Sequence, residues 1–168
     1  SVNKSFILSQ LLLHFLFPRL YSMHMNYLTY ETVTLATCAG FIVGFIWYSP
    51  ILFMNAWLYG QGITKETMPK RSKAYMIQIN LYSIIAHGAI ASVVALVFDV
   101  LQVSTLKVAV ALGMLLTFGF IVTTHYIDML YTVDGTHWNK RAQIKFLVHA
   151  GYYLCAVSVM SAVLFLVA

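Results

Sequence analysis

Four long apolar runs limit the folds open to this chain more than any other feature. They cover residues 32–53, 74–97, 106–129 and 144–168. Each run has the length of about 20 residues that a helix needs to cross the hydrocarbon core of a bilayer. Only 9% of the 168 residues are charged, whereas soluble domains carry about a quarter. A soluble fold of this size could not cover so much apolar surface. The sequence therefore predicts an all-α polytopic membrane protein.

A fifth apolar run, residues 6–17, is too short to span a bilayer. The chain ahead of Glu31 contains Lys4 and Arg19 but no carboxylate, which is typical of an organellar presequence. Two interpretations stay open for this segment: a short helix at the membrane surface, or the remnant of a presequence. We expect residues 1–24 to form an N-terminal extension and residues 25–168 to form a four-helix membrane domain.

The basic residues are unequally divided between the two ends of the predicted bundle. One end carries Lys65, Lys70, Arg71, Lys73, Lys140, Arg141 and Lys145; the other carries Lys4, Arg19 and Lys107. The positive-inside rule then predicts that the two longer loops face the cytoplasm or matrix, with both termini on the opposite side. Short basic clusters between apolar runs favour anionic lipids over nucleic acid as partners.

Aromatic and basic residues near the ends of the runs are predicted to contact lipid head groups. Trp and Tyr are enriched at membrane interfaces because their rings are amphipathic. Bound phospholipids are therefore expected. The predicted interface residues are Trp47, Tyr48, Trp57, Lys70, Arg71, Lys73, Trp138, Lys140 and Arg141.

Small residues recur at four-residue spacing in the first run. Ala36, Gly40 and Gly44 form one smooth helical face, and Gly88 and Gly151 offer lesser versions of this pattern. Small residues let helix backbones approach closely within a membrane. The pattern predicts a packing seam and leaves two possibilities open: a compact bundle, or docking against other subunits.

Polar side chains at membrane depth are costly, so their positions are informative. Asn80 and His87 lie on one face of the second predicted span, His125 and Asp128 are neighbours on the third, and His149 lies in the fourth. By depth, the last three share a layer. Three interpretations compete: a polar cluster that fixes helix register, a proton or ion relay, and a bis-histidine haem site at His125 and His149.

Motifs for catalysis or metal binding are absent from the sequence. Cys38 and Cys155 lie singly in apolar runs, and the histidines do not form a zincin pattern. Nucleophile elbows and phosphate loops are absent too. We therefore expect no enzyme activity, no metal and no cofactor.

One segment is distinctive: Gly44 to Phe53, which contains Trp-Tyr-Ser-Pro, followed by Ala56-Trp57. It resembles the family catalogued as domain of unknown function 1761. The last run, with Ala150-Gly-Tyr-Tyr-Leu154 and later Met160 and Ala162, is similar to that family's closing helix. Many bacterial members begin at a place like Met25-Asn26-Tyr27. The resemblance implies four transmembrane helices and no established activity, and His149 stands where that family is expected to have a polar residue such as Asn.

These features favour a non-catalytic accessory subunit of a larger membrane complex, most plausibly a respiratory-chain type assembly of the mitochondrial inner membrane. Other membrane subunits would then be its partners. The alternative is a small proton, ion or solute transporter that uses the His and Asp residues as a polar path.

Overall fold

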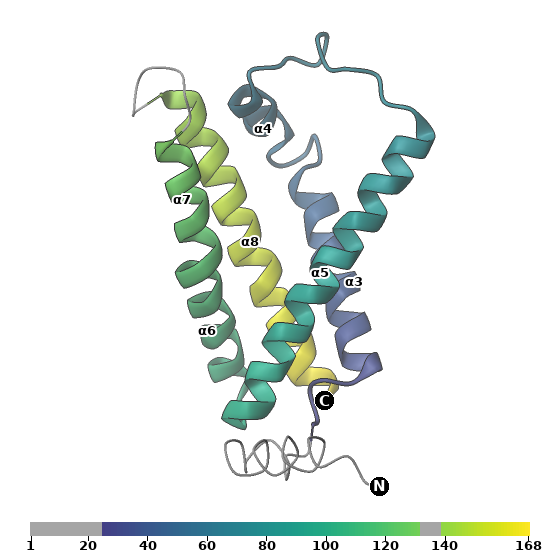
Figure 1. Cartoon of the computed structure of the whole chain (residues 1–168), viewed down its shortest axis with the longest axis vertical. Helices are drawn as coiled ribbons and strands as arrows, with labels where there is room; N and C mark the ends of the chain where they lie inside the picture. The colour runs from purple at the N-terminus through teal and green to yellow at the C-terminus, as the bar shows by residue number, and fades with distance from the viewer. Residues whose placement is uncertain (1–24, 132–138) are drawn as a thin grey trace, which may run out of the picture.

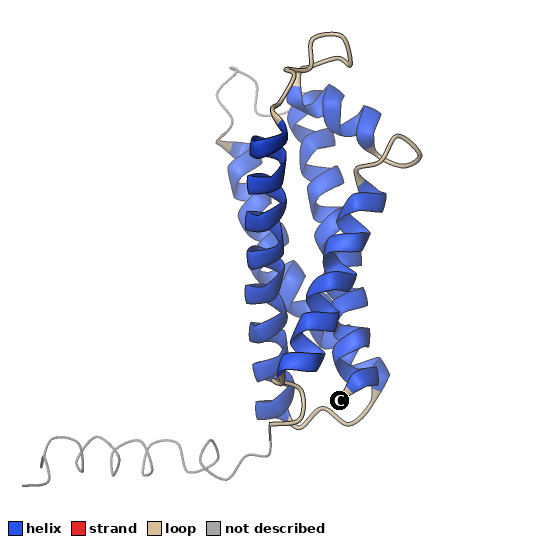
Figure 2. Ribbon diagram, turned by 90° about the vertical axis from the view of Figure 1, so that its right-hand side faces the viewer, coloured by secondary structure: helices blue, strands red, loops and turns tan. Residues whose placement is uncertain are grey.

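The computed structural model describes residues 25–131 and 139–168, and the secondary structure in these ranges is helical (Figures 1 and 2). The elements are α3 (Tyr30–Trp47), α4 (Met54–Gln61), α5 (Lys73–Leu101), α6 (Leu106–Leu116), the π-helical segment η1 (Thr117–Val122), α7 (Thr123–Leu130) and α8 (Lys140–Val167). Four helices have the length and apolar composition to cross a membrane: α3, α5, the continuous α6–η1–α7 unit, and α8. The predicted all-α class with four spans is confirmed.

Helix α8 is the centre of the bundle. It packs against every other helix in the described ranges, with α3 and α5 on one side and α6–η1–α7 on the other. Its buried face combines small side chains, such as Ala156 and Ser161, with large ones, such as Tyr152 and Met160. Gly113 of α6 lies so close to Ser161 that a Cβ atom there would overlap its hydroxyl. Close approach of this kind is the usual basis of helix packing in lipid.

The first span is shorter than the sequence predicts. Helix α3 ends at Trp47, not at Phe53, and residues 48–53 form turns that lead into α4. Pro50 lies in this turn, where its missing N–H and fixed φ are tolerated. Residues 54–61, expected to be part of a polar loop, form the short helix α4, which packs on α8 through Leu58 and Gly60.

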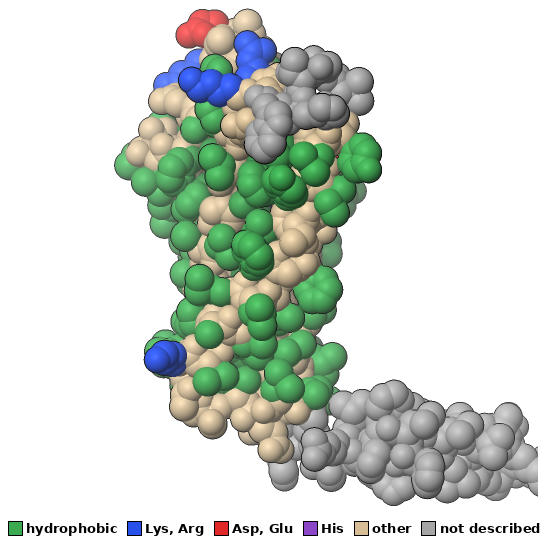
Figure 3. Space-filling model, turned by 90° about the vertical axis from the view of Figure 1, so that its left-hand side faces the viewer, with side chains coloured by type: hydrophobic (Ala, Val, Ile, Leu, Met, Phe, Trp, Pro, Cys, Tyr) green, Lys and Arg blue, Asp and Glu red, His purple; other side chains and the backbone are tan. Residues whose placement is uncertain are grey.

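The outer surface is apolar along most of the bundle. Hydrophobic side chains cover the face seen in Figure 3, and most Lys and Arg side chains on it gather at the end that carries α4. We call this end the basic end; it contains the loop of residues 62–72 and the start of α8. Exposed aromatic residues such as Phe45 and Phe120 belong to the apolar belt. An apolar belt of this kind suits lipid as its surroundings.

The other end of the bundle contains a buried carboxylate that holds the chain ahead of α3. Asp99 is 3% exposed. It accepts hydrogen bonds from the backbone N–H groups of Asn26, Tyr27 and Leu28, at 2.9–3.0 Å. The Tyr27 hydroxyl donates to the Val103 carbonyl at 2.5 Å. Burial, and then the Asp99 charge, raise the pKa of Tyr27, so its phenol stays protonated as this hydrogen bond requires.

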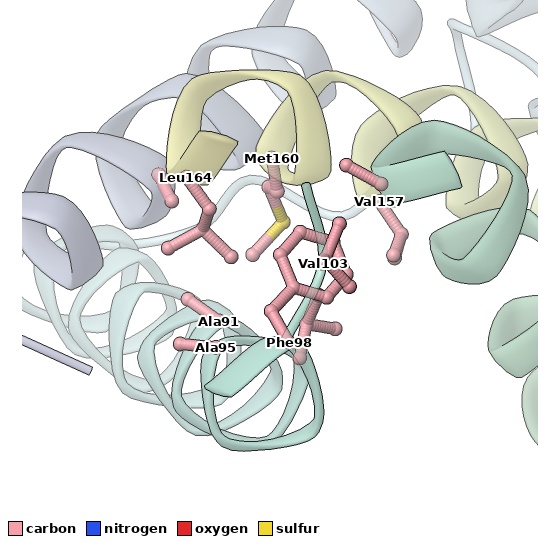
Figure 4. Close-up of a cluster of buried hydrophobic side chains, with 10 residues drawn as sticks. Ala91, Ala95, Phe98, Val103, Val157, Met160 and Leu164 are labelled. Carbon is pink, nitrogen blue, oxygen red and sulfur yellow. The ribbon is translucent and has the colours of Figure 1, made fainter. Parts of the chain in front are cut away.

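Above this anchor lies a tightly packed apolar layer (Figure 4). Phe98 and Leu164 are completely buried, as are Ala91 and Met160. The layer joins α3, α5 and α8 with the start of α6. This layer lies between the interior of the basic end and the Asp99 anchor, and the buried side chain of Ser161 follows Met160 there.

The small-residue seam of α3 is filled from within the chain. Ala36 is completely buried, and a Cβ atom on Gly40 would lie 2.5 Å from Sδ of Met160 and 2.9 Å from Cδ2 of His87. A Cβ atom on Gly44 would lie 3.1 Å from the Tyr152 hydroxyl. Gly151 is similarly close to Trp47, whereas Gly88 has ordinary contact distances. The sequence left two possibilities open for this seam, a compact bundle or docking against other subunits. In the structure the seam packs against helices of the same chain, as a compact bundle requires.

Substitution of Gly40 tests this packing. Gly40→Ala is expected to lower stability by about 1–3 kcal/mol, because overpacking forces neighbouring side chains to move. Gly119→Ala is the matched control: nothing lies within 4 Å of its Cβ position, and Ala in a helix is favoured over Gly by roughly 0.5–1 kcal/mol. Thermal unfolding in detergent measures both. Equal midpoints for the two variants would contradict the packing described here.

Candidate functional site

A pocket of about 290 Å³ opens at the basic end, between α4, α7 and α8. Its wall contains the C-terminal part of α4, the second half of α7 and the first turns of α8. The lining side chains include one carboxylate, two basic groups and two imidazoles. They are Asp128, Arg141, Lys145, His125 and His149, together with Gly60, Gln61, Gly62, Met129, Ala142 and Phe146.

Backbone geometry fixes the walls of this pocket. A Cβ atom on Gly60 would lie 3.0 Å from the backbone N and Cα of Lys145, so α4 and α8 are in near-direct backbone contact. Helix α4 ends at Gly62, which has φ +70°; this left-handed conformation favours glycine. On the opposite wall, η1 leads directly into α7 and ends at Val122, three residues before His125. Such π-helical segments are frequent at functional sites.

His125 and His149 stack on each other at the inner side of the pocket. Their ring centroids are 5.6 Å apart and their planes differ by 14°. His125 also stacks on Tyr153, at 5.5 Å. Asp128 is engaged with a neighbouring group. The sequence placed His125, Asp128 and His149 in one layer, and the structure brings all three to this pocket.

A hydrogen bond connects the pocket with the interior of the bundle. Nδ1 of His149 lies 2.9 Å from the Tyr48 hydroxyl. Burial, and then the neighbouring Tyr152 and Tyr153, raise the pKa of Tyr48 well above its usual range. Tyr48 is therefore a neutral phenol at physiological pH and shares a proton-bearing hydrogen bond with His149.

The next pair lies deeper, at the middle of α5. His87 is 6% exposed and its Nδ1 lies 2.6 Å from the Ser83 carbonyl oxygen. A carbonyl only accepts, so Nδ1 carries the hydrogen and Nε2 of the neutral imidazole is an acceptor. The Tyr152 hydroxyl donates to this Nε2 in a short hydrogen bond. The rings of Tyr48 and Tyr152 are 5.2 Å apart and join the two hydrogen-bonded pairs.

These contacts form a continuous row of imidazole and phenol groups, which we call the His–Tyr row. It runs from the pocket to the middle of the bundle and consists of His125, His149, Tyr48, Tyr152 and His87. Beyond His87 the apolar layer around Met160 and Phe98 begins. In the described part of the chain, the row thus reaches from the pocket at the basic end to this layer.

Other residues expected in the site or at the interface lie elsewhere. Asn80 is half-buried on α5, nearer to its basic end, and takes no part in the row. Trp47 donates from Nε1 to the Val148 carbonyl at 3.1 Å, so its indole N–H is hydrogen-bonded within the protein and not to a lipid head group. Trp57 is half-buried against Tyr48. Lys70, Arg71, Lys73 and Lys140 are exposed at the basic end, whereas Trp138 lies outside the described residues.

Sequence reasoning missed the roles of Tyr48 and Tyr152. Tyr48 was expected at the lipid interface, because it lies at the end of an apolar run. Its hydrogen-bond partner is 101 positions away in the chain, and that of Tyr152 is 65 positions away. The four-residue spacing from Gly44 to Tyr48 was the available signal, since it places Tyr48 on the packed face of the helix.

A metal or haem is not what this geometry favours. In residues 25–131 and 139–168, no three His, Cys, Asp or Glu side chains gather as metal ligands would. His125 and His149 present ring faces to each other, whereas bis-histidine haem ligation needs a nitrogen of each ring to point at one iron. Cys38 and Cys155 are exposed and unlinked.

Removing one hydroxyl tests the deeper pair. Tyr152→Phe leaves Nε2 of His87 buried without its donor, and we expect a loss of about 1–3 kcal/mol in stability. Tyr153→Phe is the control, because Tyr153 contacts His125 through its ring and its hydroxyl makes no hydrogen bond to a described residue. Chemical or thermal unfolding of both variants gives the comparison. A Tyr152→Phe protein as stable as Tyr153→Phe would show that the hydrogen bond is absent.

Comparison with curated proteins and with solved structures gave no match. Comparison with family profiles gave one: the family described as "Protein of unknown function (DUF1761)" matches residues 32–165. The match begins two residues after the start of α3 and ends within the last turn of α8, so it contains the pocket and the whole His–Tyr row. Residues 1–31 precede the match as a short N-terminal extension. The chain belongs to the DUF1761 family of membrane-helical proteins.

Proposed function

We propose that this protein is a small membrane transporter that moves protons, alone or coupled to a solute or ion, across the membrane. The protons would pass between the basic end and the middle of the bundle along the His–Tyr row. The observation that carries this proposal is the His–Tyr row. Groups that donate and accept protons are costly within a membrane, and they commonly mark ion and proton pathways. Imidazole is suited to the task because it titrates near neutral pH.

The apolar layer supports a transporter over an open channel. Met160, Phe98 and Leu164 close the route beyond His87. A proton that reaches His87 can leave on the far side only if the bundle changes conformation. Rocking of one group of helices against another is the general mechanism of alternating access. In this bundle, α3 and α5 on one side of α8 and α6–η1–α7 on the other are natural moving parts.

The orientation follows from charge. Among the described residues, the basic end carries Lys65, Lys70, Arg71, Lys73, Lys140, Arg141 and Lys145, and the other end carries Lys107. By the positive-inside rule, the pocket then opens to the cytoplasm, or to the matrix if the membrane is the mitochondrial inner membrane. The Asp99 anchor and the end of α8 lie on the opposite side.

Proton flux into liposomes tests the proposal. Tyr48→Phe removes the hydroxyl that is hydrogen-bonded to His149 and leaves the ring contact with Tyr152 in place. We expect proton uptake, followed with an enclosed pH-sensitive dye, to fall at least about tenfold, which corresponds to a barrier increase of about 1.4 kcal/mol. Tyr126→Phe is the control, since Tyr126 is exposed and packs on Phe146 through its ring. Asp128→Asn is expected to reduce flux too.

The proposal fails if Tyr48→Phe and the unchanged protein carry protons at the same rate. It fails equally if neither conducts more protons than empty liposomes under an imposed membrane potential. Both results are informative only when the protein is shown to be folded and inserted, which the unfolding assays above establish.

A second function, that of an accessory subunit in a larger membrane complex, is favoured by a different observation. The α6–η1–α7 unit packs mainly on α8 among the described helices. Its outward residues include Leu115, Phe118 and Phe120, which are 59–71% exposed. Most of this helix is thus open to lipid or to another subunit, for example in a respiratory-chain type assembly of the mitochondrial inner membrane. The seam at Gly40 does not support this function, because Met160 and His87 of the same chain already fill it.

Native gels after mild solubilisation separate the two functions. A subunit of a larger complex is expected to migrate with its partners, and a self-sufficient transporter as a monomer or small homo-oligomer. Migration with partners that is lost when Phe118 and Phe120 are both changed to Ala would favour the subunit. Migration as a monomer in every mild detergent would count against it.

A further inference from the structure

We propose that the pocket at the basic end binds an anionic oxygen group of the phosphate type, carried by a small solute or by a lipid head group. This inference rests on the proposed function and names the class of ligand that enters its site. The ligand would occupy the pocket mouth, in front of His125 and His149.

The charge of the lining favours an anion. Arg141 and Lys145 bring two basic side chains to the lining, and Asp128 is the single carboxylate among the lining residues. The pocket keeps a formal positive excess even when both imidazoles are neutral. Gln61 and the two imidazoles add neutral groups that can hydrogen-bond to oxygen.

The start of α8 strengthens this field. Arg141, Ala142 and Lys145 lie in the first two turns of a 28-residue helix. A helix N-terminus carries a partial positive charge that acidic residues usually balance, yet the first turn of α8 contains none. Two basic side chains beside this terminus oppose the dipole. A bound anion would relieve both their mutual repulsion and their conflict with the helix.

Arg141 is held in place by the end of α4. Its guanidinium lies 5.8 Å from the centre of the Tyr59 ring, within the range of a cation–π contact. A Cβ atom on Gly62 would lie 3.5 Å from Nη1 of Arg141, so the glycine turn also borders this group. A guanidinium fork matches two oxygens of a phosphate or carboxylate.

The size of the pocket defines the ligand further. Its volume of about 290 Å³ is at the lower limit of typical small-molecule sites. It suits one anionic group with a few further atoms. The position at the basic end, where head groups would lie in the bilayer, makes a soluble phosphate and a lipid phosphate two sources of the same chemistry.

Thermal unfolding of the full chain in an uncharged detergent tests the proposal. A ligand that binds only the folded state raises the unfolding midpoint with concentration. The probes are inorganic phosphate, at ionic strength held constant with potassium chloride, and short-chain phosphatidic acid, with short-chain phosphatidylcholine as its control. The variants are Arg141→Gln and Lys145→Gln. Lys140→Gln is the matched control, because Lys140 is exposed on the same helix and does not line the pocket.

We expect at least one anionic probe to raise the midpoint of the unchanged protein and of Lys140→Gln. The apparent affinity should fall at least tenfold in Arg141→Gln and Lys145→Gln. A response to inorganic phosphate identifies a soluble ligand, and a response to phosphatidic acid alone identifies a head group. The proposal is overturned if neither probe has an effect, or if all three variants respond equally. A chain that carries protons without binding either probe would refute this inference alone, whereas binding without flux would refute the transporter.

Discussion

The close approach of α3 to α5 and α8 is the contact on which the rest of the structure depends. Gly40 and Gly44 leave no side chain between the helices, and Met160, His87 and Tyr152 occupy the space. In lipid there is little hydrophobic drive between helices, so association relies on such packing and on internal hydrogen bonds. The same two glycines therefore bring α3 into the bundle and set Tyr48 opposite His149 one turn further along. A bulkier residue at either position would displace the site together with the helix.

The two halves of the bundle serve different purposes. The half at the basic end contains a pocket and a row of proton-bearing side chains, each with its hydrogen-bond or ring partner. The other half contains an apolar layer and, below it, the Asp99 carboxylate with three backbone donors. Buried polar groups in lipid need partners; His87 and Asp99 have them, whereas the buried hydroxyls of Ser49 and Ser161 have no hydrogen-bond partner among the described residues. Asp99 only anchors the chain, whereas the His–Tyr row leads from the pocket inward, and this continuity is the reason for proposing transport.

Hydropathy predicted the four spans correctly because bilayer thickness imposes a length that the residues must match. Helix α4 was missed, since its eight residues are too few to span and Gly60 and Gly62 suggest a loop. The shared layer of His125, Asp128 and His149 could be expected from depth alone. The His87–Tyr152 and Tyr48–His149 pairs could not, because they depend on how each helix is rotated about its axis. Asp99 follows the second apolar run; its role depends on the backbone N–H groups of residues 26–28, which no side-chain pattern reveals.

The hydrogen-bonding state of His87 tests the central claim most directly, because the row ends at this residue. The ¹⁵N chemical shifts of histidine in the full chain, with His87 assigned by its loss in His87→Gln, report which ring nitrogen carries hydrogen. We predict a neutral His87 with hydrogen on Nδ1 and an accepting Nε2 whose shift changes in Tyr152→Phe. Hydrogen on Nε2, or an Nε2 shift that is insensitive to the loss of the Tyr152 hydroxyl, would contradict it.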